Sequence, residues 1–327
     1  LNASVASFAF CEDATNNLSM YKPLISANQN FLEVVNRLPA VDDRLQKLST
    51  LEKLIGENIF TDIQKAQKYL AEERQILDEF DQPDFEINYH LNTALIENQL
   101  YNYKLSEIHF SKAIEILGDR GDVSQLAEAY IDYAGTLLNL EQSDKANYYL
   151  TQAANYLKSF PDQRLQAWLI CRAGYFHQKN SNPAKALQAF YESKKRIEKL
   201  EKPLAMKDFY FITLIQSGIG SIHHQNGEPE KSISAYLEVV KLCEQHGMRS
   251  RLSWHFGNVG NGFMEMSNFD NAILYFRKAI KVLDDVNVQA RAQAYANLGY
   301  CYFKKGHFKE ALELLRKAQP LFKEKQD

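Results

Sequence analysis

A small residue recurs along this chain at nearly constant intervals, and this recurrence limits what the chain can fold into. From residue 94 onward the intervals are 40, 40, 46, 40 and 39 residues. The recurring positions are Ala94, Ala134, Gly174, Gly220, Gly260 and Gly299. Chance rarely keeps one residue class in phase over so many units, so we expect a repeat architecture in which each unit packs on its neighbours.

Each recurring unit has the pattern of two amphipathic helices. A second small residue follows the first after twelve positions, a large apolar residue follows after four more, and a mostly small residue lies three beyond. In the last unit these residues are Gly299, Ala311, Leu315 and Ala318. Helices pack about 8–10 Å apart, and the shorter distances need small residues at the crossing. A glycine inside a helix costs about 1 kcal/mol relative to alanine, so its recurrence indicates a packing role.

The stretch from Ala294 to Ala318 resembles a tetratricopeptide repeat. The residues that carry the resemblance are Tyr295, Leu298, Gly299, Tyr302, Gly306, Ala311 and Ala318. The resemblance extends over about residues 47–325, with a period near 40 like that of bacterial sensory and regulatory arrays. It implies an all-α fold, a right-handed α-solenoid superhelix of antiparallel helix pairs.

The same pattern gives the expected organisation of the chain. We expect an N-terminal segment with one or two helices over residues 1–46, the first of them near 28–38, and a degenerate first unit over 47–86. Residues 87–327 hold six units, at about 87–120, 127–160, 167–200, 213–246, 253–286 and 292–325. The longest interval contains Pro203, which predicts a longer surface loop there, with a change in superhelix geometry as the alternative.

Composition excludes several classes of function. A net charge of −3 disfavours general nucleic-acid binding, which needs a basic field. The chain has no apolar run of the roughly 18 residues that a membrane-spanning helix needs. Four cysteines, at positions 11, 171, 243 and 301, are isolated from one another, which indicates a reducing compartment and a cytoplasmic location.

The sequence contains no recognisable catalytic motif. There is no phosphate-binding P-loop, no metalloprotease H-E-x-x-H and no G-x-S-x-G nucleophile elbow. His223 and His224 are adjacent, and adjacent residues on a helix point about 100° apart, which makes a shared metal ion unfavourable. We therefore expect no enzyme activity, catalytic residue, metal site or cofactor.

The resemblance implies that the first helices of successive units line a concave groove. We expect a peptide to be bound there by Trp168, Arg172, Tyr175, Ser221, His224, Trp254, Asn258, Asn261, Asn297 and Tyr300. Both tryptophans of the chain occupy one repeat offset. An asparagine amide can donate to a peptide carbonyl and accept from its N–H. The alternative is that the asparagines only solvate the helix or help to pack the turn.

The functional expectation is a protein- or peptide-binding scaffold. By resemblance, we expect the sensory or regulatory module of a larger bacterial signalling protein, with an output domain beyond Asp327. The expected partner is a peptide or protein segment, without direct nucleic-acid binding and without a membrane segment in this stretch. The alternative is a free-standing adaptor or assembly protein with no attached output domain.

Overall fold

The computed structural model describes residues 42–80, 82–120, 123–282 and 288–323. Within these ranges the chain forms helices and turns and no strand. The helix expected near residues 28–38 lies outside the described residues. The chain divides into two compact units, residues 1–51 and 52–327, and the contacts described below lie within the second.

Within the described residues, two helices precede the regular array. They are α4 (Asp42–Asn58) and α5 (Ile63–Leu77). The carboxylate of Asp62 accepts a hydrogen bond from the backbone N–H of Lys65 at 3.2 Å, so Asp62 caps the N-terminus of α5.

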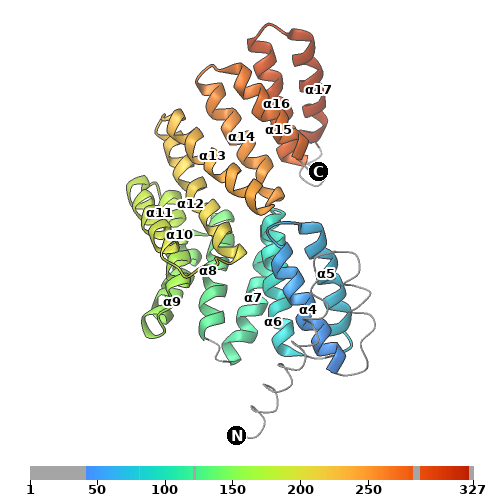
Figure 1. Ribbon diagram of the computed structural model, residues 1–327, viewed down its shortest axis with the longest axis vertical. Helices are drawn as coiled ribbons and strands as arrows, with labels where there is room; N and C mark the ends of the chain where they lie inside the picture. Colours follow the sequence, from blue (N-terminus) through green and yellow to red (C-terminus); the bar gives the residue numbers. More distant parts are fainter. Residues whose placement is uncertain (1–41, 81, 121–122, 283–287, 324–327) are drawn as a thin grey trace, which may run out of the picture. The chain divides into compact units, whose positions relative to one another are not determined.

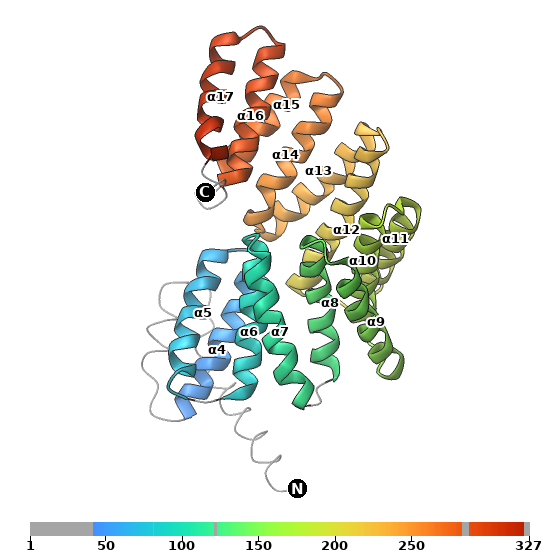
Figure 2. The same ribbon diagram turned by 180° about the vertical axis from the view of Figure 1, so that it is seen from behind.

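Six helix pairs follow. Their bounds are α6 (Pro83–Gln99) and α7 (Tyr103–Arg120), α8 (Val123–Asn139) and α9 (Ser143–Ser159), α10 (Gln163–Lys179) and α11 (Pro183–Glu198), α12 (Met206–Gln225) and α13 (Pro229–His246), α14 (Arg249–Glu265) and α15 (Phe269–Val282), and α16 (Val288–Lys304) and α17 (Phe308–Lys323). The two helices of each pair pack on each other, and each second helix packs on the first helix of the next pair (Figures 1 and 2). This arrangement confirms the predicted all-α solenoid of antiparallel helix pairs.

Small residues make the close crossing within each pair. A Cβ atom added to Gly174 would lie 2.7 Å from the Phe190 ring, and one added to Gly260 would lie 2.8 Å from the Phe276 ring. Both phenylalanines are fully buried. The small residue of the first helix therefore lies directly beneath the large residue sixteen positions later, as the sequence pattern predicted.

The long interval adds both a connection and a helical turn. After α11 ends at Glu198, residues 199–205 lead to α12, which has 20 residues where α10 and α14 have 17. In repeat phase Leu214 matches Trp168. Helix α12 begins eight residues before Leu214, and α10 begins five residues before Trp168. The extra turn places Lys207 and Asp208 on the N-terminal end of α12, beyond the region that other first helices occupy.

In the described parts of the chain, no helix is both long enough and apolar enough to span a bilayer.

Candidate binding surface

Helices α14 and α16 carry polar and aromatic side chains at matching positions. The spacings along each helix are four, three and four residues, so each set lies along one face. We call the two sets together the α14–α16 surface. Its residues are Trp254, Asn258, Asn261 and Glu265 on α14, and Gln293, Asn297, Tyr300 and Lys304 on α16.

Side-chain amides connect the two helices of this surface. The Nε2 atom of Gln293 donates to Oδ1 of Asn297 at 2.8 Å, and Nδ2 of Asn297 donates to Oδ1 of Asn261 at 2.8 Å. The amide of Asn258 forms no hydrogen bond with the rest of the described chain. Asn258 therefore keeps both its donor and its acceptor available, one helical turn from the Asn261–Asn297 bond.

An open depression of about 560 Å³ lies at one end of the α14–α16 surface. Met264 and Phe269 line its apolar side. Asn297, Tyr300 and Lys304, all on α16, line its polar side. The Lys304 ammonium lies 5.4 Å from the centroid of the Tyr300 ring. This depression can hold an apolar side chain next to groups that bind polar atoms.

Charged groups of both signs border the depression. Glu265 lines it beside Lys304, and its Oε1 atom lies 3.1 Å from Nδ1 of His224 on α12. The His224 and Glu265 side chains are 44% and 38% exposed, so solvent screens this pair. A bound segment can therefore meet either charge at this end of the surface.

The predicted site residues on α10 have a different environment. Trp168 is buried, and its Nε1 donates to Oδ1 of Asp208 at 3.1 Å. Its indole stacks on the Phe211 ring with centroids 4.9 Å apart and an interplanar angle of 2°. The Lys207 ammonium lies 4.9 Å from the same indole. Helix α12 thus covers Trp168 completely.

Arg172 belongs to a buried ionic network over three first helices. Its Nη2 donates to Oδ1 of Asp132 on α8 at 3.4 Å, and Lys207 donates to Asp132 and to Glu128. Burial alone would lower the pKa of Lys207, but the Asp132 and Glu128 carboxylates hold it above its usual value. Lys207 is therefore charged and engaged at neutral pH. We call Glu128, Asp132, Trp168, Arg172, Lys207 and Asp208 the inner network.

Two more predicted residues make internal contacts. The Tyr175 hydroxyl donates to the backbone carbonyl of Leu214 at 2.6 Å. Ser221 accepts from Nε2 of Gln178 at 2.9 Å. The structure thus brings Trp254, Asn258, Asn261, Asn297 and Tyr300 together on one surface, with His224 at its edge through Glu265. Trp168, Arg172 and Tyr175 instead make hydrogen bonds to other parts of the chain, on α8 and α12.

Sequence reasoning missed Lys207 and Asp208 because they lie in the six residues that lengthen one interval, outside the counted offsets. It also missed Phe269, which comes from a second helix. The unusual length of the 46-residue interval was the one signal in the sequence that could have pointed to Lys207 and Asp208.

Comparison with known proteins agrees with the repeat pattern. Two family models described as "Tetratricopeptide repeat" match residues 216–246 and 250–324. The chain is similar to response regulator aspartate phosphatase E of Bacillus subtilis (strain 168), with 23% identity over 187 residues. That alignment covers 56% of this chain and 48% of the relative, so the chain spans about half of that protein's length.

Solved structures show the same likeness. One is a Rap protein complexed with Competence and Sporulation Factor, with 14% identity, a TM-score of 0.65, and coverage of 96% of this chain and 98% of that one. Another is NprR in complex with its cognate peptide NprX, with 15% identity, a TM-score of 0.62, and coverage of 92% and 88%. At these identities the likeness is one of fold. The matched family models identify residues 216–246 and 250–324 as tetratricopeptide repeats, and the same helix-pair arrangement extends over the earlier pairs of the described chain.

Proposed function

We propose that this chain is a regulatory module that binds a peptide segment in extended form on the α14–α16 surface. The observation that carries the proposal is the exposed Trp254 ring, which is followed one turn later by the Asn258 amide, an amide with no hydrogen-bond partner among the described residues. The structurally similar NprR is in complex with its cognate peptide, which supports a peptide as the class of ligand.

The amides of this surface suit an extended backbone. Such a backbone offers alternating N–H and C=O groups, and an asparagine side chain can pair with one of each. Asn258 has both groups available, and the bond between Asn297 and Asn261 fixes the orientation of those two amides. Fixed amides lose less conformational entropy on binding, which favours affinity.

Side chains of the peptide have two places to bind. The exposed indole of Trp254 offers a flat apolar face at one end of the surface. The depression beside Met264 and Phe269 offers an apolar pocket at the other end. In this proposal Ser221 and His224 border the surface, whereas Trp168, Arg172 and Tyr175 make contacts with α8 and α12 instead.

The proposal assigns a binding role rather than catalysis to this chain. Within the described chain, Asp132 and Glu128 of the inner network pair with Arg172 and Lys207, and Asp208 pairs with Trp168 and with Arg164, so these carboxylates have structural partners. As a regulatory module the chain would transmit peptide binding to an output domain of a larger signalling protein, and a free-standing adaptor is the alternative.

The test uses a displayed library of random ten-residue peptides selected on the full chain. We expect selected peptides to bind the wild type and to lose about tenfold or more in affinity on the Asn258→Ala/Asn297→Ala variant. Asn92→Ala is the matched control, because Asn92 occupies the same repeat offset on α6. Undiminished binding by the double variant, with helicity unchanged by circular dichroism, would contradict the proposal.

A further inference from the structure

Arg251 is a partly buried cation that has no counter-ion in the described chain. It lies in the first turn of α14, and its guanidinium carbon is 5.0 Å from the centroid of the Tyr210 ring on α12. Its Nε–H group is buried without an acceptor, and its side chain forms no ion pair or hydrogen bond with the described residues. The first turn of α14 contains no acidic residue that could supply a partner. The guanidinium is therefore free to donate to an anion.

Other partly or fully buried arginines of the chain do have carboxylate partners. A side-chain nitrogen lies at most 3.4 Å from an Asp or Glu oxygen in each of Arg74, Arg164, Arg172 and Arg196. Taking a charge out of water costs free energy, and a nearby opposite charge offsets that cost. No described residue offsets it at Arg251, and a bound carboxylate would supply the missing partner.

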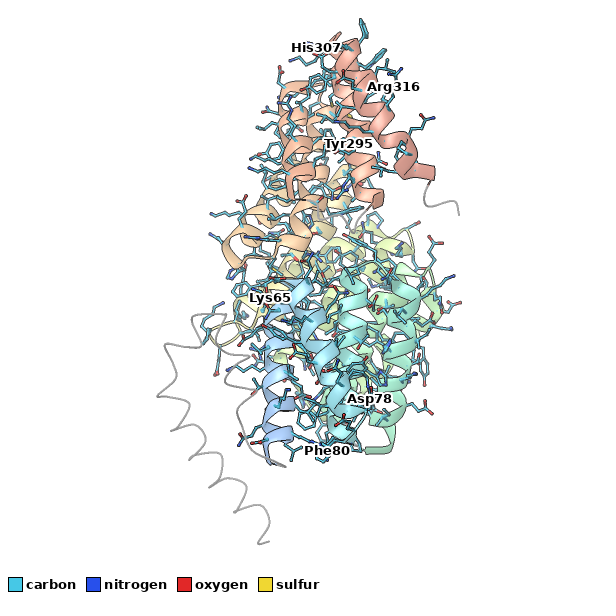
Figure 3. The ribbon with its side chains drawn as sticks, turned by 90° about the vertical axis from the view of Figure 1, so that its right-hand side faces the viewer. Lys65, Asp78, Phe80, Tyr295, His307 and Arg316 are labelled. Carbon is cyan, nitrogen blue, oxygen red and sulfur yellow. The ribbon has the colours of Figure 1, made fainter. Side chains whose placement is uncertain are left out.

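Titratable groups that interact with the charge of Arg251 are themselves neutral at pH 7. Burial raises the pKa of the Tyr101 and Tyr103 hydroxyls, and it raises the pKa of the Cys243 thiol to about 11. Burial and the Arg251 charge together lower the pKa of His255, so its imidazole is uncharged. Figure 1 and Figure 3 both show the N-terminal end of α14 next to the turn between α6 and α7, where Tyr101 lies. These neighbours do not neutralise Arg251.

Arg251 lies on the same face of α14 as the residues to which we assign peptide binding. It precedes Trp254 by three residues and Asn258 by seven, and these spacings place the three side chains on one face. Arg251 therefore extends the α14–α16 surface at the end opposite the depression. Seven residues of helix rise about 10 Å, which is the length of about three residues of an extended peptide.

We propose that Arg251 binds a carboxylate of the peptide, an inference that rests on the proposed function. A planar guanidinium matches a carboxylate in shape and can donate two parallel N–H bonds to it. The carboxylate comes either from the C-terminus of the peptide or from an Asp or Glu side chain. In both cases it lies about three peptide residues from the one that pairs with Asn258.

The test uses three synthetic bead libraries of ten-residue peptides, attached through their N-termini and selected on the full chain. The first has a free C-terminal carboxylate and no Asp or Glu. The second has a C-terminal amide and allows Asp and Glu, and the third has a C-terminal amide without Asp or Glu. We expect binders from the first library if the C-terminus supplies the carboxylate, from the second if a side chain does, and none from the third.

Each binder is then compared with its own neutral form, in which the C-terminus is amidated or the acidic residue is replaced by its amide. On the wild type the neutral form should bind about tenfold more weakly or worse, because it loses a charge-assisted pair. On Arg251→Gln both forms should bind equally, whereas a structural role for Arg251 would weaken both by the same factor. Arg249→Gln is the matched control, since Arg249 is exposed in the same helical turn, and should keep the wild-type difference.

Two results would overturn the inference and leave the proposed function standing. One is a set of binders from the third library that match the others in affinity. The other is a preference for the acidic form that persists in Arg251→Gln, or that is lost in Lys304→Gln instead. In both cases the binders would still lose affinity on Asn258→Ala/Asn297→Ala. Failure of all three libraries would contradict the proposed function itself, and the inference with it.

Discussion

The two tryptophans occupy one repeat offset and have opposite environments. Trp168 is 4% exposed and Trp254 is 54% exposed. The extra turn of α12 brings Lys207 and Asp208 onto Trp168, and Phe211 of the next turn stacks on its indole, whereas α16 begins at Val288 and places Gln293 in the position that matches Trp254. Repeat phase therefore decides which way a side chain points, and the length of the neighbouring helix decides whether it stays accessible.

Replacing each tryptophan should give the largest contrast. Trp168→Ala removes a stacked, hydrogen-bonded ring from a packed site and should lower the free energy of unfolding by about 3–5 kcal/mol. Trp254→Ala should change it by about 0.5 kcal/mol or less, because the ring is mostly in solvent. Urea unfolding of both variants measures the contrast. Equal losses would mean that the two positions do not differ as described.

Breaking the inner network should have the next largest effect. Asp132→Ala leaves Arg172 and Lys207 without a shared carboxylate in a buried site, which should cost about 3 kcal/mol. Glu265→Ala is the matched control at the α14–α16 surface, where its partner His224 is exposed, and should cost about 0.5 kcal/mol or less. A loss under about 1 kcal/mol for Asp132→Ala in urea unfolding would contradict the ionic network.

A buried carboxyl that lacks a partner should behave differently from Asp132. Within the described residues, neither carboxylate oxygen of Glu73 has a hydrogen-bond partner, and the residue is fully buried. Burial, with further contributions from Glu52 and Glu86, raises the pKa of Glu73 to about 8. Because its folded pKa lies above its unfolded value, its contribution to stability is full below about pH 4.5 and is lost as the pH rises to about 8.

The wild type should therefore lose about 1.4 kcal/mol per pH unit from this group between those pH values. Glu73→Gln should lack this component, so the difference in unfolding free energy between the two proteins should change with pH at that slope. Urea unfolding at pH 5, 6, 7 and 8 provides the measurement. Parallel curves for the two proteins would show that Glu73 is ionised and paired in the folded chain.

Replacing one of two glycines of α14 should have the smallest effect on stability. These variants test whether α14, which carries half of the α14–α16 surface, is well packed. A Cβ atom on Gly260 would lie 2.8 Å from the Phe276 ring, so Gly260→Ala should cost about 1–3 kcal/mol. A Cβ atom on Gly257 would meet nothing within 4 Å, so Gly257→Ala should stabilise the chain by about 0.5–1 kcal/mol. Thermal unfolding compares the two, and a loss for both would place Gly257 in a packed contact.

The sequence predicted the helix pairs and their buried residues well, because the same four offsets serve the same packing in every unit. Gly174 and Gly260 are examples, since each lies beneath the large residue that the pattern assigned. Accessibility was harder to predict. The offset rule treated Trp168 and Trp254 alike, and the covering residues Lys207 and Asp208 lie in the irregular interval, where the rule assigns no positions.

The central claim is that Trp254, and not Trp168, contacts the bound peptide. The chain has two tryptophans, so Trp168→Phe and Trp254→Phe each leave one indole as a reporter. Acrylamide should quench the fluorescence of Trp254 strongly and that of Trp168 weakly, and a library-selected peptide should protect Trp254 alone. Protection should disappear in the Asn258→Ala/Asn297→Ala background. Protection of Trp168, or an unprotected Trp254 at saturating peptide, would contradict the account.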